Sequence, residues 1–399
     1  MTGRPEIEGD FVMGWADRKR PTPRVLRDDQ GRVQSVRTPV ADLEGLITPT
    51  DLRYVVVQLD APEPVHPDDW TLSIAGGVER PIELNLEELQ KFPGATVRCV
   101  HECSGSDQDF FDYLKSGGKT YGCYLHQPQV GKPTRFNPEN DHNGLLSSGE
   151  WTGVPLAVVL ERLGVKDGAV GVLAQGFDRG RPAEFATVAA QSVPEGELNF
   201  EKCLPMEKAL DRDTLLAWAL NGEYIRHIHG GPVRLITPGW SGNWSVKWLQ
   251  KLEVLAHMPP LYYQTQYFYY AQTPQESDKE MITAMGVKSI VTEPSDDTPP
   301  LPLGQHLIRG LAWSGGGQIT RVEVSVDGGE TWQDAHREQP QERWLWVRWS
   351  HLWHAEKPGR YAIMARATDE TGRVQPQIGW NYLRKNFDGI VPVEVEVKP

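Results

Sequence analysis

Three scarcities in this sequence limit what the protein can be. Cysteine is the first: the 399 residues include only Cys99, Cys103, Cys123 and Cys203, too few for a disulfide framework in a chain of this size. No apolar run approaches the roughly 20 residues needed to span a bilayer, and the first residues lack the apolar core of a secretory signal. We therefore expect free thiols, no membrane span and a cytoplasmic location, or a periplasmic one if a leader has been removed.

Positive charge is the third scarcity. The chain has 41 lysine and arginine residues against 54 aspartate and glutamate residues, which gives a formal net charge of −13 at pH 7. Nucleic acid and anionic membranes are bound by basic surfaces, so neither is expected as a partner. Any anionic ligand must therefore meet a local cluster of positive side chains.

The length predicts more than one domain, because a single hydrophobic core stops growing at roughly 250 to 300 residues. Residues 1–45 are polar and lack sustained periodicity, which predicts an arm that lies over the surface or is partly disordered. Residues 46–286 mix short β-like runs with helical patterns at 151–165 and 203–223, so we expect an α+β domain there.

The pattern of residues 287–399 is typical of a small β-sandwich, because short strands alternate with turn signals. The clearest part is ITRVEVSVDGGETWQDA at 319–335, where apolar residues approximately alternate before Gly328 and Gly329. These glycines supply the positive φ that a hairpin turn requires. We interpret this second domain as immunoglobulin-like.

Cys103 is the first candidate for chemistry. It stands in ECSGS, where a β-like run ends and small residues follow, so its sulfur can face a cavity while Gly105 lets a large planar ligand approach the backbone. A thiolate suits a soft or high-valent metal. Free cysteine also packs as a small hydrophobic residue, and on the residues alone both interpretations stay open.

A second candidate block is HIHGGPVRLITPGWSGNWSVKWL, which contains His229, Arg234 and Lys247 among glycines. Three donors with a glycine-flanked backbone can hold a phosphate or a polar heterocycle in an otherwise acidic protein. The same residues are also common on solvated surfaces. Asp178, in AQGFDRG, is either a ligand or an ordinary turn residue.

Taken in order, these and other motifs resemble the molybdenum domain of the sulfite oxidase family. The matching segments are ITPTD at 47–51, W-x-L-x-I-x-G-x-V-x-x-P at 70–81, ECSG, WTGVPL at 151–156, LPMEKAL at 204–210, NGE at 221–223, H-G-x-P-V-R-L at 229–235, P-G-W-x-G at 238–242 and SVKWL at 245–249. KSIVTEPS, SVDGGETW and ATDETGRVQP look like the family's dimerisation domain, closest to the bacterial branch with the sulfane dehydrogenase molybdenum subunit. The resemblance runs from about residue 45 to the end.

The resemblance implies an α+β molybdopterin-binding domain followed by an immunoglobulin-like β-sandwich, and a molybdenum–molybdopterin cofactor. Cys103 would be the metal ligand, with Tyr267 and Arg384 as further catalytic residues. The cofactor would be contacted by Tyr54, Gln58, Cys103, Asp178, His229, Arg234, Ser245, Val246 and Lys247. It also implies two-electron oxo transfer on a small oxyanion or other oxo substrate, an external electron acceptor such as a cytochrome or a partner subunit, and a homodimer.

The sequence departs from the family where the substrate anion is bound. Two of the family's arginines fall on Val56 and Gln108, the asparagine after its cysteine falls on Ser106, and a third arginine is retained as Arg384 if one inserted residue is allowed. Three hypotheses follow: oxidation of sulfite or a related sulfur compound, reduction of an S-oxide, N-oxide or nitrate by the same cofactor, and a cofactor-free remnant that serves in assembly.

Overall fold

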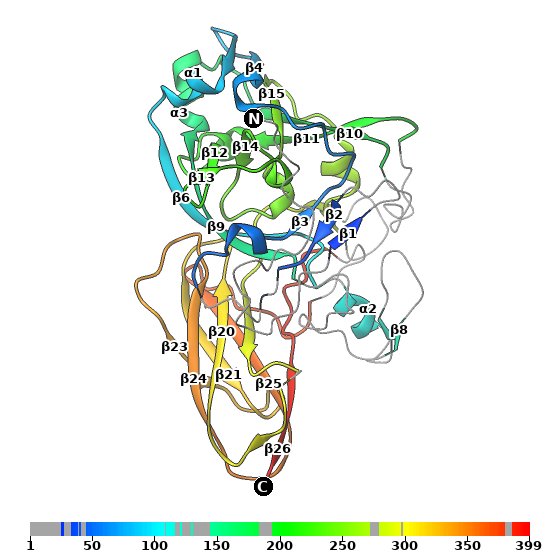
Figure 1. Cartoon of the computed structure of the whole chain (residues 1–399), viewed down its shortest axis with the longest axis vertical. Coiled ribbons are helices and arrows are strands. Elements are labelled where there is room, and N and C mark those ends of the chain that lie inside the picture. The colour runs from blue at the N-terminus through cyan, green and yellow to red at the C-terminus, as the bar shows by residue number, and fades with distance from the viewer. Residues whose placement is uncertain are drawn as a thin grey trace.

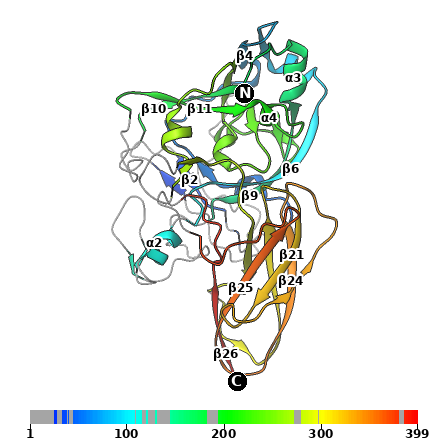
Figure 2. The same ribbon diagram turned by 180° about the vertical axis from the view of Figure 1, so that it is seen from behind.

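The computed structural model of the chain describes residues 25–27, 33–38, 40, 45–107, 109–115, 120–121, 129–130, 144–182, 194–271, 279–296, 298–379 and 385–399. Cys123, Gln108 and Arg384 lie outside these residues. The described chain forms two lobes, the first from the N-terminal part and the second an elongated lobe with the C-terminus at its far end (Figure 1). The view from behind shows the same division, with α2 (Asp109–Lys115) to the side of the junction (Figure 2).

Two sheets build the first lobe. One has the strand order β11 (Leu198–Pro205), β10 (Gly171–Gly180), β15 (Leu249–Leu255), β4 (Thr71–Gly76) and β5 (Ile82–Asn85). The other has the order β13 (Glu223–Tyr224), β12 (Leu215–Leu220), β9 (Leu146–Pro155) and β6 (Ala95–Glu102), with β14 (Arg234–Ile236) also paired to β12. The β15–β4 pair is parallel, and the other pairs in these sheets are antiparallel.

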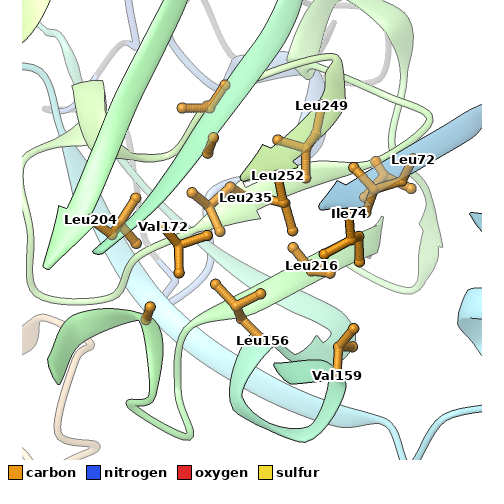
Figure 3. Packing of buried hydrophobic residues seen from close by; sticks show 14 of the residues in the cluster. Leu72, Ile74, Leu156, Val159, Val172, Leu204, Leu216, Leu235, Leu249 and Leu252 are labelled. Carbon is orange, nitrogen blue, oxygen red and sulfur yellow. The ribbon is translucent and has the colours of Figure 1, made fainter. Parts of the chain in front are cut away.

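The core of this lobe lies between the two sheets and is closed by short helices. Ten of its buried side chains are labelled in Figure 3: Leu72, Ile74, Leu156, Val159, Val172, Leu204, Leu216, Leu235, Leu249 and Leu252. Burying each such side chain contributes roughly 1.5 to 3 kcal/mol. Helix α1 (Leu86–Gln90) begins at a capping box formed by Asn85 and Glu88, and α3 (Leu156–Leu163) ends at Gly164, whose φ is +74°.

The helical prediction for 203–223 is mostly wrong. Only α4 (Met206–Ala209) is helical there, whereas the apolar run LLAWAL forms β12. Paired on both sides within its sheet, β12 is mostly buried, and a short continuous apolar run suits a buried strand as well as a helix. The pattern at 151–165 likewise begins as the end of β9 and becomes helical only from Leu156.

The described part of the N-terminal arm is more ordered than its polarity predicts. Strands β1 (Val25–Arg27) and β2 (Val33–Val36) form an antiparallel sheet with β3 (Val55–Val56). Val36 is fully buried in a cluster with Trp248, and Val40 is buried in a second cluster, so apolar side chains anchor this part of the arm.

The second lobe is a β-sandwich, as the sequence predicts. One sheet has the strand order β18 (Lys288–Glu293), β20 (Gly304–Trp313), β24 (Val347–Ala355) and β23 (His336–Arg337). The other has the order β19 (Leu301–Pro302), β26 (Val393–Lys398), β25 (Gly359–Asp369), β21 (Ile319–Ser325) and β22 (Gln333–Asp334). Gly328 and Gly329 have φ of 76° and 96° in the expected hairpin turn. The immunoglobulin-like label and the boundaries at residues 45 and 286 stay predictions.

Short antiparallel pairs complete the described chain: β7 (Thr120–Tyr121) with β8 (Gln129–Val130), and β16 (Tyr269–Tyr270) with β17 (Glu280–Met281). A separate hydrophobic cluster joins the lobes. In this cluster Val100 of β6 and Leu146 of β9 pack with Ile290, Leu311 and Trp313 of the sandwich. The ends of β6 and β9 therefore lie at the junction, and Cys103 directly follows β6.

Candidate active site

The first lobe contains a pocket that opens to solvent, with about 660 Å³ of empty space when its open mouth is included. All but one of the residues predicted to contact the cofactor line it: Tyr54, Gln58, Cys103, Asp178, His229, Arg234, Ser245 and Lys247. These residues come from widely separated stretches of the chain. The fold therefore gathers the predicted set in one cavity, while the role of each residue stays a prediction.

Three predicted residues are not part of this lining. Val246 is fully buried in the core, where its amide donates to the Trp244 carbonyl. Tyr267 packs edge-on against Phe268, and it is Phe268 that lines the pocket. Arg384 lies outside the described residues. The register of the catalytic tyrosine therefore stays a prediction.

The backbone around Cys103 holds the thiol at the pocket wall. Its amide donates to the Leu145 carbonyl at 2.9 Å, its carbonyl accepts from Ser106 at 2.9 Å, and its Sγ accepts from the Gly105 amide at 3.4 Å. Burial raises the pKa of the thiol, while the Gly105 amide and the positive charge of Lys385 oppose that rise. Metal coordination would therefore have to displace the thiol proton.

Cys103 is the candidate protein ligand for a metal in this pocket. Among the described residues, no group of three or more histidine, cysteine, aspartate or glutamate side chains is arranged to hold a metal ion. A metal beside Cys103 would thus take its remaining ligands from a bound cofactor or from solvent. That arrangement fits a metal carried by an organic group better than an all-protein metal site.

A buried arginine, Arg53, and a half-buried one, Arg234, form the positive floor of the pocket. The guanidinium carbons of Arg53 and Arg234 lie 5.0 and 5.4 Å from the centre of the Trp151 ring. Arg53 donates to the Ser148 carbonyl, and Arg234 donates to the carbonyls of Ser245 and His229 at 3.1 and 2.9 Å. Burial lowers the pKa of both arginines to about 10, which leaves them charged.

Neither arginine has a charged partner in the described part of the chain, where no carboxylate forms an ion pair with either. Buried charges are costly unless they are paired. Carbonyl acceptors and an aromatic face offset part of that cost, but they do not neutralise the charge. The floor is therefore built to receive an anionic group.

Lys247 and Asp178 form a second polar region of the pocket. Lys247 Nζ donates to the Val56 carbonyl at 2.8 Å, and burial together with Arg234 lowers its pKa. Asp178 lies where the register of β10 is interrupted, and its buried Oδ1 has no hydrogen-bond partner among the described residues. Burial raises its pKa to about 7. An acceptor left open in this way fits a ligand that brings N–H donors, as a pterin does.

His229 is a neutral imidazole in this pocket. Burial and the nearby arginines hold its pKa well below 6.5. Its Nε2 lies 3.1 Å from the Thr50 carbonyl, which can only accept, so the proton is on Nε2. Gly230 follows with a φ of +97°, and a Cβ there would lie 2.6 Å from Lys247 Cβ, so only glycine lets this turn approach Lys247.

Tyr54 and Gly242 bring a phenol to the same cavity. A Cβ on Gly242 would lie 2.4 Å from the Tyr54 hydroxyl, so the glycine makes room for that hydroxyl. Burial and the neighbouring Cys103 raise the pKa of Tyr54, which keeps the phenol protonated. The Tyr54 hydroxyl is therefore a proton donor close to the candidate metal ligand.

Sequence reasoning missed two cations of this site. Arg53 belongs to no motif, and its only signal is a charged residue directly before an apolar run. Lys385 lies beside the expected Arg384 and is buried, with its Nζ 4.3 Å from the Tyr267 ring centre and 5.6 Å from that of Phe268. Its positive charge also acts on the Cys103 thiol, as does that of Arg37.

Together, a single thiol, an unneutralised arginine floor and an open carboxylate acceptor define a site for an anionic cofactor that carries a metal. The donor set fits a pterin with a phosphate: Arg53, Arg234 and Lys247 match the phosphate, and Asp178 matches the heterocycle. The class of protein that this site fits is therefore a cofactor-dependent redox enzyme.

Comparisons with known proteins agree with this class. Residues 58–263 match the family model "Oxidoreductase molybdopterin binding domain", and residues 279–390 match "Mo-co oxidoreductase dimerisation domain". The chain belongs to the family of oxidoreductases with this molybdopterin-binding domain. The family resemblance, the molybdenum–molybdopterin cofactor and the oxidoreductase class predicted from the sequence are confirmed, and the remnant hypothesis loses its support.

The relatives include nitrate reductases. The chain is 30% identical over 371 residues to nitrate reductase [NADH] 2 of Phaseolus vulgaris, and 30% identical over 371 residues to nitrate reductase [NAD(P)H] of Hordeum vulgare. Each alignment covers 85% of this chain but 38% of the relative. The chain therefore spans less than two-fifths of the length of these enzymes.

Among solved structures, the sulfane dehydrogenase SoxCD of Paracoccus pantotrophus is similar over 94% of this chain and 90% of the matched chain. The TM-score is 0.72 and the sequence identity is 28%. This similarity extends across both lobes. Within the described part of the chain, no helix has the length and apolar character needed to cross a membrane.

The first prediction concerns Cys103. We expect Cys103→Ser to abolish turnover while circular dichroism and thermal midpoint stay close to those of the parent, because a hydroxyl is a poorer donor to the metal and little volume changes. The matched control is Cys203→Ser, because Cys203 is a buried free cysteine outside the pocket lining, and this variant should retain activity. Unaltered turnover in Cys103→Ser would exclude this ligand.

The second prediction concerns Asp178, whose pKa rises from 3.8 to about 7 on folding. The unfolded chain therefore binds fewer protons between these values, and folded stability falls as the pH rises through that window. We expect cofactor-free Asp178→Asn to melt above the cofactor-free parent at pH 8, with the difference shrinking toward pH 5. Differential scanning fluorimetry tests this, with the exposed Asp167→Asn as control. A difference independent of pH would contradict the assignment.

Proposed function

We propose that the protein catalyses two-electron oxo transfer on sulfite or a related sulfur compound and passes the electrons to an external acceptor. The observation that carries this proposal is the meeting of Cys103 with the uncompensated charges of Arg53 and Arg234 in one pocket. The bound molybdenum cofactor supplies the oxo-transfer and redox chemistry. The protein supplies binding, orientation and proton donors.

The residues divide this work by position. Arg53, Arg234 and Lys247 hold the anionic end of the cofactor, and Asp178 accepts from its heterocycle. Cys103 binds the metal and fixes its place in the pocket. The Tyr54 hydroxyl, which stays protonated, donates a hydrogen bond to a substrate oxygen near Cys103.

The wall on which the substrate rests favours a weakly charged sulfur compound over tightly bound sulfite. Val55, Val56 and Phe268 line the pocket, and Val56 stands where the family's sulfite-binding arginine falls. Losing a charge-assisted hydrogen bond to a desolvated anion costs roughly 1.5 to 3 kcal/mol. Similarity to a sulfane dehydrogenase over nearly the whole of both chains supports a sulfur substrate.

Nitrate reduction is the second candidate. It is supported by the identity of 30% to nitrate reductases over 85% of the chain, and by Val56, since nitrate carries one negative charge and needs fewer cations than sulfite. The two functions run in opposite redox directions, so assays can separate them.

The third prediction separates these substrates. Turnover is measured with sulfite and other reduced sulfur compounds against ferricyanide, and with nitrate and S-oxides against a reduced dye. We expect sulfur oxidation with a high KM for sulfite, and a KM for sulfite lowered at least about tenfold in Val56→Arg, with Val56→Leu as the matched uncharged control. Saturation of the parent by micromolar sulfite would contradict the pocket's assignment, and turnover of nitrate alone would select the second candidate.

The fourth prediction concerns assembly. We propose a homodimer formed through the sandwich lobe, supported by the dimerisation-domain match at 279–390. Leu307 and Leu352 are cross-strand partners on β20 and β24 with 41% and 60% of their surfaces exposed, a candidate contact area. Light scattering should give twice the mass of one chain for the parent and a shift toward one chain for Leu352→Glu. A monomeric parent would contradict the proposal.

A further inference from the structure

The loop that carries Cys103 is flanked by two buried carboxylates. Glu102 directly precedes the cysteine, and Asp107 ends the loop with a φ of +56°. They are 7% and 0% exposed, respectively. Neither side chain lines the pocket, so neither is needed to bind the cofactor.

Both carboxylates are held by one lysine of the other lobe. Lys288, the first residue of β18, is 2% exposed and donates from Nζ to Glu102 Oε1 and, at 3.2 Å, to Asp107 Oδ2. Trp313 of β20 donates to the second oxygen of Glu102 at 3.0 Å. The sandwich lobe therefore clamps the cysteine loop at both of its ends.

A second segment of the sandwich lobe holds the middle of the loop. The Asn386 amide donates to the Ser104 carbonyl at 2.7 Å, and the Asn386 side chain donates to the Tyr270 hydroxyl at 2.8 Å. From the first lobe, the Leu145 carbonyl accepts a hydrogen bond from the Cys103 amide. The loop backbone is thus fixed from both lobes, with the thiol between them.

The charges of the three side chains explain why this clamp fixes the geometry of the loop. A buried lysine between two carboxylates satisfies its desolvation cost only in a narrow geometry, and removing it leaves buried, uncompensated charge. Because Glu102 and Asp107 bracket the loop, the position of Lys288 sets the direction of the peptide units between them. The direction of the Cys103 Sγ follows from that backbone.

We propose that Lys288 is a positioning residue that fixes the Cys103 thiolate toward the metal, which makes the sandwich lobe a structural part of the active site. This inference rests on the proposed function, in which Cys103 is the metal ligand. The lobe has this role within one chain, whether or not it also joins two chains.

The test uses two variants: one removes the three charges at nearly constant side-chain volume, and the other keeps them. In Glu102→Gln/Asp107→Asn/Lys288→Met the three groups become uncharged, and in Lys288→Arg the charges stay but the donor geometry changes. The matched control is Lys208→Met, because Lys208 is 7% exposed and pairs with Asp211 at 2.8 Å, outside the cysteine loop and the pocket lining. Each purified enzyme is measured for molybdenum content, for the g values of its paramagnetic molybdenum signal after partial reduction, and for kcat and KM.

We expect both Lys288 variants to shift the g values and lower kcat at least about tenfold with little change in KM, since small misplacement of a reacting centre has effects of this size. Lys208→Met should lower the thermal midpoint without moving the g values. If the triple variant does not fold, Lys288→Arg decides alone. Unchanged g values and kcat in a folded Lys288 variant would overturn the inference.

Failure of the inference can be told from failure of the proposed function. If Cys103→Ser leaves the molybdenum signal unchanged, the ligand assignment itself is wrong. If Cys103→Ser abolishes or alters the signal while the Lys288 variants do not, only the positioning role is wrong.

Discussion

Arg53 and Arg234 lie against the same tryptophan ring inside the first lobe, and among the described residues no carboxylate pairs with either. Two like charges in a buried space oppose folding unless an anion joins them. Although the chain has a net charge of −13, these two arginines make the pocket locally positive. The positive floor and the open acceptor Asp178 both fit a pocket that is completed by a phosphate-bearing cofactor.

The sequence predicted which residues gather in one pocket better than it predicted the secondary structure. Short motifs such as ECSG and SVKW pointed to Cys103 and Lys247, and the pocket lining contains both, while their roles stay predictions. The helix expected over LLAWAL is a strand, because pairing partners far away in the sequence decided its conformation. The local sequence pattern does not show which distant strands will pair with a segment.

The positions of Arg53 and Lys288 could not be predicted from their neighbours in the sequence. Arg53 lines the pocket and donates to the Ser148 carbonyl of β9, a contact that crosses 95 residues of sequence. Lys288 meets Glu102 across 186 residues, between lobes that composition suggests are separate domains. In the sequence, each is a lone positive charge beside apolar residues. Only the three-dimensional arrangement distinguishes them from lysines and arginines on the surface.

The central claim is a bond between the Cys103 sulfur and the molybdenum of the bound cofactor. X-ray absorption at the molybdenum edge tests it most directly, on loaded parent and on loaded Cys103→Ser, because sulfur scatterers in the first coordination shell can be counted. We expect one sulfur fewer in the variant than in the parent, with an oxygen in its place. An identical sulfur count in the two proteins would contradict the bond and, with it, the site.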